Sequence, residues 1–160
     1  MSNVVALLAF EEGWRPKPYL CSEGYPTVGF GFKIGPKGAD ISLYQFSLPF
    51  SAATAWMDAL IYSRSQELLS HAVIGPAWKA CNEARRGVLI SMAYQMGVDG
   101  LSAFRNTLAA VAEGRWSAVA DEMMDSRWAR QTPERAWRHA QQMRSGVWDS
   151  LYEGEPDGAD

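Results

Sequence analysis

Apolar positions recur with helical spacing through most of the chain. Residues 3–12 begin with Asn3, a suitable N-cap, and continue as the apolar run Val4 to Phe10, so a helix is predicted there. A second helix is predicted from Ser51, another suitable N-cap. Its apolar stripe consists of Ala53, Trp56, Met57, Leu60, Ile61 and Leu68.

The C-terminal half also shows helical patterns. The predicted segments are a helix from Gly75-Pro76 to Met96-Gly97, two short helices over about 102–112 and 116–125 with Gly114 between them, and a helix from the N-cap Thr132 through Pro133 to Gly146. Residues from Val88 to Met96 are apolar almost all round, which is typical of a buried central helix.

The region 13–50 has no helical period. Prolines and glycines interrupt its first part, and residues 35–50 are irregular. From Thr27 the residues alternate, with Val28, Phe30, Phe32 and Ile34 on one face and Thr27, Gly29, Gly31 and Lys33 on the other. This predicts one strand with a bulky face and a bare face. Glycines in a strand often mark a close approach to the backbone.

These patterns predict a mostly helical α+β fold in one domain over residues 1–152. A small β-containing lobe is expected over about 13–50, and a larger helical lobe over about 51–152 together with the N-terminal helix 3–12. The cleft between two such lobes is a favoured place for a ligand. Residues 153–160 are predicted to form a disordered acidic tail.

Charge and composition exclude several classes of protein. The net charge of −3 includes four acids of the tail, which leaves residues 1–152 at +1 and gives no electrostatic case for binding nucleic acid. Two cysteines are too few for a disulfide framework, so free thiols are expected. The apolar run Val4 to Phe10 is too short to span a bilayer, and no membrane insertion is predicted.

Few residues offer chemistry on their own. His71 and His139 lie far apart without partners at ligand spacing, so no metal site and no cofactor are predicted. Glu12, at the end of the first helix, is either a partly desolvated general acid or an ordinary exposed residue beside Glu11. Cys21 is a buried small hydrophobe, a nucleophile or a water-positioning group, and Thr27 alone is most simply a strand residue.

Three blocks of the sequence in order resemble the phage-type lysozymes, glycoside hydrolase family twenty-four. Glu12, Cys21 and Thr27, followed by GFG, resemble that family's triad of Glu, Asp or Cys, and Thr. The other blocks are RRGVLISMAYQMGVDGLSAFRNTL and RWSAVADEMMDSRWARQTPERAWRHAQQMRSGVW. Together they cover most of residues 3–148. The chain departs from the family's pattern at Cys21, where Asp is common, at Phe32, where His is common, and over 33–50.

The resemblance implies hydrolysis of the β-1,4 bond between N-acetylmuramic acid and N-acetylglucosamine in bacterial peptidoglycan. Glu12 would protonate the leaving oxygen, and Cys21 and Thr27 would hold the water that attacks from the opposite face, with inversion. A free thiol has a pKa of about 8.5, and no cation adjoins Cys21 in the sequence, so the expected role is a thiol that positions and polarises the water. A lysozyme-like fold of two lobes is implied as well.

Other site residues follow from the same resemblance. Arg135 would pair with Glu12, which would lower the pKa of the acid and oppose its role, or would lie on a solvated helix face. Tyr94, Gln95 and Met96 would line the sugar-binding cleft, or simply end a buried helix. Glu23 would contact the sugar or the peptide stem, and Gly31 would support the site.

The implied biological role is lysis of a bacterial host by a phage or prophage. A monomer is expected, held in the host cytoplasm until a separate holin lets it reach the cell wall. The alternatives are a non-catalytic peptidoglycan-binding module of the same fold and a cysteine-dependent hydrolase that uses Cys21. The intact Glu12, Cys21 and Thr27 argue against the first, and the lack of a nearby His argues against the second.

Overall fold

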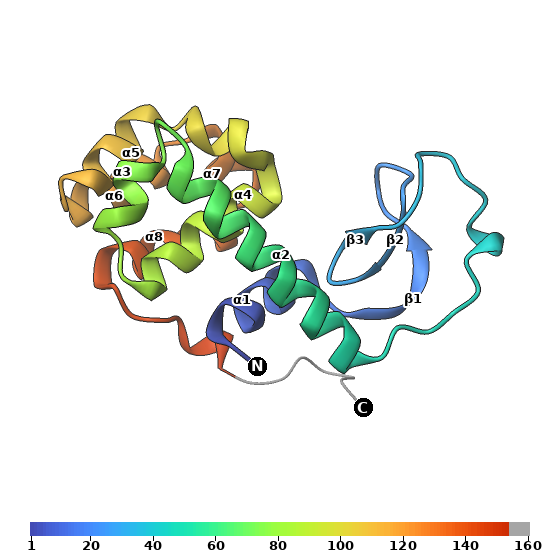
Figure 1. Cartoon of the computed structure of the whole chain (residues 1–160). Coiled ribbons are helices and arrows are strands. Elements are labelled where there is room, and N and C mark those ends of the chain that lie inside the picture. Colours follow the sequence, from blue (N-terminus) through green and yellow to red (C-terminus); the bar gives the residue numbers. More distant parts are fainter. Residues whose placement is uncertain (154–160) are drawn as a thin grey trace. The chain divides into compact units, whose positions relative to one another are not determined.

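The computed structural model describes residues 1–153, which fall into two compact units (Figure 1). The first unit is Met1–Leu60 with the described residues from Leu151 onward, and the second is Ile61–Ser150. Of the predicted acidic tail, only Glu153 lies within the described residues. In this part of the chain no helix has both the length and the apolar character needed to cross a membrane.

The predicted mostly helical α+β class is confirmed. The first unit contains α1 (Asn3–Glu12), β1 (Arg15–Leu20), β2 (Pro26–Gly29), β3 (Phe32–Lys33) and the 3-10 turn η1 (Ile41–Leu43). The helix α2 (Phe50–Ser70) begins in the first unit and continues into the second. The second unit adds α3 (Gly75–Ala80), α4 (Glu83–Ser102), α5 (Arg105–Ala112), α6 (Trp116–Met124), α7 (Arg127–Gln131) and α8 (Pro133–Ser145), before the 3-10 turn η2 (Ser150–Tyr152).

The first helix ends where the candidate acid lies. Ser2, and not Asn3, is its N-cap, and the Ser2 hydroxyl accepts a hydrogen bond from the Val5 N–H at 3.4 Å. Gly13 ends the helix with a φ of 78°, a left-handed value that favours glycine. Glu11 accepts a hydrogen bond from the Tyr152 hydroxyl at 2.8 Å, which fixes the end of the helix within the first unit.

The prediction of one strand from Thr27 to Ile34 is wrong. The strand β2 ends at Gly29, the chain turns through Phe30 and Gly31, and β3 pairs back antiparallel, with Thr27 opposite Lys33 and Val28 opposite Phe32. Gly29 and Gly31 have φ values of 67° and 83°, so both glycines serve the turn instead of a bare strand face.

The strand β1 was not predicted from the sequence, because its two prolines are typical of irregular segments. The sheet order is β1-β2-β3, so β1 is an edge strand, where a missing N–H is tolerated. The register between β1 and β2 shifts between Arg15 and Tyr19, which marks a bulge in the proline-containing stretch.

Most of the predicted helices are present, but their bounds differ in several places. The short helices α5 and α6 are confirmed within a few residues, and Gly114 separates them with a φ of 69°. The long helix predicted after Gly75 is two helices, because Asn82 caps α4 by accepting a hydrogen bond from the Arg85 N–H. Gly97, with a φ of 81°, kinks α4 where the sequence predicted its end.

Two predicted N-caps were misplaced or misread. Ser51 lies inside the first turn of α2, which begins at Phe50. Thr132 does precede α8, but its hydroxyl donates a hydrogen bond back to the Trp128 carbonyl at 3.1 Å, so it links α7 to α8. Trp56 and Leu60 of the predicted apolar stripe are exposed, whereas Ala53 and Met57 are buried.

The turn glycine Gly29 offers a test of the hairpin. A Cβ at Gly29 would lie 2.9 Å from the Phe32 ring, whereas a Cβ at Gly38, with a φ of 81°, would meet nothing within 4 Å. Gly38→Ala should therefore cost only the left-handed backbone term, about 1 kcal/mol in the free energy of unfolding. Gly29→Ala adds overpacking and should cost about 2–4 kcal/mol. Urea unfolding of both variants checks this, and equal losses would contradict the close contact.

Candidate active site

Glu12 lies at the C-terminal end of α1, against the β2–β3 turn. Its side chain is half-buried, and its Oε1 atom is buried from solvent. A Cβ placed on Gly31 would lie 3.6 Å from Oε2 of Glu12. The bare backbone of Gly31 thus forms one wall beside the carboxyl group.

The carbonyl group of Tyr25 ties Cys21 and Thr27 together. It accepts a hydrogen bond from the Cys21 N–H at 3.0 Å and another from the Thr27 hydroxyl at 2.8 Å. Thr27 is 2% exposed, so this hydroxyl has little access to bulk water. The two residues that the sequence placed six positions apart are therefore held at one point.

The thiol of Cys21 lies among hydrogen-bond donors. Its pKa is lowered, first by the backbone N–H of Tyr25, then by the N–H of Glu23, the Thr27 hydroxyl and the Lys33 ammonium, while burial acts in the opposite direction. The Thr27 hydroxyl has one proton, so it serves either the Tyr25 carbonyl or the thiolate at a given moment. No cation adjoins Cys21 in the sequence, but the hairpin brings the Lys33 ammonium close enough to lower the pKa of the thiol.

The pKa of Tyr19 is affected by both Glu12 and Cys21. Burial raises the pKa of Tyr19, the Arg15 guanidinium lowers it, and negative charge at Cys21 and Glu12 raises it. The Arg15 guanidinium carbon lies 3.8 Å from the centre of the Tyr19 ring, which explains its influence. Glu12 and Cys21 are thus both close enough to Tyr19 to perturb it.

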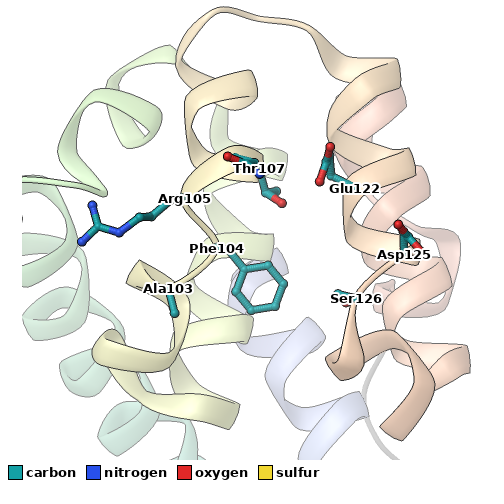
Figure 2. A pocket seen from close by; sticks show the side chains of 8 residues that line it. Ala103, Phe104, Arg105, Thr107, Glu122, Asp125 and Ser126 are labelled. Atoms are coloured by element: carbon teal, nitrogen blue, oxygen red, sulfur yellow. The ribbon is translucent and has the colours of Figure 1, made fainter.

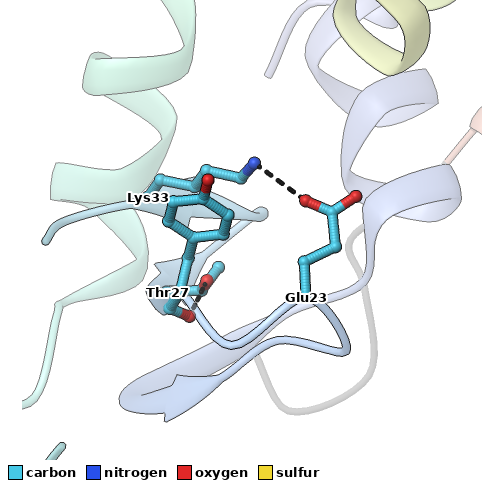
Figure 3. A network of polar contacts seen from close by, with 4 residues as sticks. Glu23, Thr27 and Lys33 are labelled. Carbon is cyan, nitrogen blue, oxygen red and sulfur yellow. Dashed lines mark hydrogen bonds and ion pairs between the residues drawn. The ribbon is translucent and has the colours of Figure 1, made fainter. Parts of the chain in front are cut away.

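Glu23 forms an ion pair on the surface of the same hairpin. Its Oε2 lies 3.3 Å from Nζ of Lys33, and both side chains are more than half exposed (Figure 3). The Lys33 ammonium also lies 4.2 Å from the centre of the Tyr25 ring. Lys33 carried no assigned role in the sequence, since its closeness to Cys21 depends on the turn.

The second unit holds the remaining candidates. Tyr94, Gln95 and Met96 immediately precede the kink at Gly97, and Gln95 Oε1 accepts a hydrogen bond from Trp128 Nε1 at 2.8 Å. Arg135 is buried at 8% exposure, so the reading of a solvated helix face is wrong.

Arg135 belongs to a buried polar group that the sequence did not reveal. Its guanidinium donates hydrogen bonds to Ser91, to the carbonyl at 3.2 Å and to Oγ at 2.8 Å. Ser91 Oγ also lies 2.8 Å from Nε2 of His139, which is fully buried. Burial holds the pKa of His139 well below its usual range, and Arg135 and Arg138 lower it further. The sequence signal for this buried polar group was Ser91, a polar residue within the mostly apolar segment from Val88 to Met96.

A pocket of the second unit contains none of the predicted residues. It has a volume of about 290 Å³ and lies between the start of α5 and the end of α6. Figure 2 shows Arg105 and Thr107 on the α5 side, and Glu122 and Asp125 on the α6 side. Phe104 of its wall packs edge-on against Trp128, the partner of Gln95. The pocket is thus lined by one cationic residue, Arg105, and by two anionic residues, Glu122 and Asp125.

No group of three or more His, Cys, Asp or Glu within residues 1–153 has the arrangement of a metal site.

Comparison with known proteins decides the family. The model of the phage lysozyme family matches residues 9–144, which include every candidate residue named above. The chain belongs to the phage lysozyme family. The resemblance noted in the sequence is thereby confirmed.

The curated relatives are distant. The chain is 32% identical over 152 residues to the "Pre-baseplate central spike protein Gp5" of Enterobacteria phage T4, covering 85% of this chain and 26% of that protein. It thus spans about a quarter of the spike protein's length. It is 26% identical over 164 residues to "Probable T4-type lysozyme 1" of Dictyostelium discoideum, covering 92% of this chain and 96% of that protein. A second protein of that organism, "Probable T4-type lysozyme 2", is 24% identical over 155 residues, covering 86% and 91%.

The buried His139 should make the free energy of unfolding depend on pH. Its lowered pKa means that the unfolded chain, with a histidine pKa of about 6.5, takes up a proton first as the pH falls. The free energy of unfolding should therefore decline below about pH 6.5, by up to about 1.4 kcal/mol per pH unit. His139→Gln keeps a polar partner for Ser91 but should remove this component. Urea unfolding between pH 7 and 5 measures both slopes, and equal slopes would contradict the assignment.

Proposed function

We propose that this chain is a muramidase that hydrolyses the β-1,4 bond between N-acetylmuramic acid and N-acetylglucosamine in peptidoglycan. The observation that carries the proposal is the placing of Glu12 against Gly31 while Tyr25 holds Cys21 and Thr27 together, within a family match that covers all of them. The lysozyme names of the Dictyostelium relatives support the same activity.

Glu12 is the proposed general acid. The burial of its Oε1 atom and its position at the negative end of the α1 dipole both disfavour the carboxylate form. The protonated carboxyl group gives its proton to the glycosidic oxygen as the bond to the anomeric carbon breaks.

Cys21 and Thr27 are proposed to handle the attacking water. The thiol is partly exposed, so a water molecule can reach it. The buried Thr27 hydroxyl is proposed to help fix the position of this water. Water attacks the anomeric carbon on the face opposite the leaving oxygen, and the product has inverted configuration. This role needs no covalent bond to sulfur and therefore no base to activate it.

The remaining assignments concern substrate binding and biology. Tyr94, Gln95, Met96 and Glu23 are proposed to contact the glycan or its peptide stem. We also propose that the enzyme acts as a monomer in host lysis, kept in the cytoplasm until a separate holin opens the membrane.

Purified cell walls test the function directly. Loss of turbidity with new reducing ends on muramic acid is the expected result. Binding to the walls without new reducing ends would favour the non-catalytic module. Loss of turbidity with new amino groups and no reducing ends would favour a cysteine-dependent hydrolase instead.

Glu12→Gln should abolish lysis while the protein stays folded. The amide keeps the shape of the side chain but cannot give a proton, and loss of a positioned acid typically costs ~10²–10⁴ in rate. Glu11→Gln is the matched control, because Glu11 bonds to Tyr152 and takes no part in the chemistry. Turbidity assays at equal folded concentration compare the two. Wild-type lysis by Glu12→Gln would show that Glu12 is not the acid.

Replacing Cys21 separates water handling from nucleophilic attack. Cys21→Asp should keep substantial activity, because a carboxylate can hold and deprotonate the same water. Cys21→Ala should lose most activity, since nothing remains there to orient the water. The anomer released first, measured before mutarotation, should be inverted in the wild type and in Cys21→Asp. Retention of configuration, or a sugar adduct on Cys21 seen by mass spectrometry, would disprove the water-handling role.

A further inference from the structure

Lys33 lies on the same face of the sheet as the water-handling residues. Thr27 and Lys33 are direct partners in the β2–β3 ladder, and the side chains of such partners project to one face at about 4.5–5.5 Å between Cβ atoms. The ammonium of Lys33 extends over the ring of Tyr25, the residue that binds both Cys21 and Thr27. Figure 3 shows the ammonium directed toward the carboxylate of Glu23.

Resting on the muramidase function proposed above, we infer that Lys33 is a positioning residue whose ammonium increases the fraction of Cys21 present as the thiolate, the form that deprotonates the attacking water. Lys33 thereby stabilises on the Cys21 sulfur the negative charge that an aspartate at this position would carry by itself. The lowered pKa of Cys21, to which Lys33 contributes, agrees with this geometry.

The proposed step balances without any further reactant. The oxygen of water forms a bond to the anomeric carbon while one of its protons moves to the Cys21 sulfur. The bond from that carbon to the glycosidic oxygen breaks, and Glu12 gives this oxygen its proton. Cys21 then holds a proton that Glu12 lacks, and exchange with solvent returns both groups to their starting states.

Several charged groups act around the thiol in the first unit. Lys33 favours the thiolate, whereas the Glu23 carboxylate opposes it indirectly, by drawing the ammonium to itself at 3.3 Å. Glu12 and the thiolate both act on Tyr19, whose other charged neighbour is Arg15. Lys33 is thus the cation that acts on the sulfur itself, and Arg15 acts on Tyr19.

Alkylation of Cys21 by iodoacetamide measures the thiolate without any substrate. The assay uses the Cys81→Ala protein, although burial already raises the pKa of Cys81 to about 11 and suppresses its reaction. Lys33→Met should slow alkylation at pH 7 by roughly two- to fivefold, the size that exposed charge pairs support, and should move the pH profile upward. Lys17→Met, at an exposed lysine of β1 that is not among the groups lowering the pKa of Cys21, is the matched control and should leave the rate unchanged.

Glu23→Gln provides a test of opposite sign. The change removes a negative charge and releases the Lys33 ammonium from its ion pair, so alkylation of Cys21 should become faster. A pair that served only the folded structure would give no increase. Unchanged alkylation in both Lys33→Met and Glu23→Gln would overturn the inference.

Wall hydrolysis links the thiolate to the reaction. Lys33→Met should reduce the rate of reducing-end release by the same roughly two- to fivefold near pH 7. In the Cys21→Asp background the same change should cost little, because a carboxylate with a reference pKa of about 3.9 is already ionised. An equal loss in both backgrounds would place Lys33 on the substrate and overturn the inference.

The two proposals fail in different ways. If the wild type releases no reducing ends, the muramidase function fails, and the role of Lys33 in hydrolysis fails with it, whatever the alkylation rates are. If the wild type hydrolyses walls and Lys33→Met changes neither alkylation nor the pH profile, only the inference about Lys33 fails.

Discussion

The candidate site depends on the backbone of one residue, Tyr25. Its carbonyl oxygen accepts from the Cys21 N–H and from the Thr27 hydroxyl, and its N–H lowers the pKa of the Cys21 thiol. The turn that allows this is closed by a hydrogen bond from the Gly24 N–H to the Cys21 carbonyl at 2.9 Å, with Gly24 at a φ of 84°. Because main-chain groups make these bonds, the position of residue 21 does not require one particular side chain. A thiol or a carboxylate can occupy it with the same geometry.

The second constraint is the reversal of the chain at Gly29 and Gly31. In a continuous strand Lys33 would lie about 20 Å from Thr27, at about 3.3 Å per residue, although on the same face. In the hairpin the two are ladder partners, and Gly31 meets the Glu12 carboxyl group. One turn therefore brings a wall to the acid and a cation to the thiol. The left-handed φ values explain why glycine stands at both places.

The sequence predicted the fold class, most helices and the candidate triad, and it failed where long-range pairing decides the structure. Alternation from Thr27 to Ile34 fits one strand or two. Three residues separate the ladder partners Val28 and Phe32, so the alternation continues through the turn and the turn was missed. Prolines in β1 concealed an edge strand. The burial of Arg135 could not be predicted from a polar stretch of helix, since it depends on Ser91, which lies 44 residues away from Arg135 in the sequence. The resemblance identified the family, but the cation at Cys21 required the hairpin.

The order of the influences on Cys21 limits what Lys33 can do. The Tyr25 N–H contributes most to the lowered pKa, and the Lys33 ammonium least. Lys33 is more than half exposed, so water and salt screen its charge, with a Debye length of about 8 Å at physiological ionic strength. The main-chain donors are fixed by the turn and are screened far less. The backbone therefore makes the thiol a competent acceptor, and the cation adjusts the thiolate fraction by a factor that should shrink as the salt concentration rises.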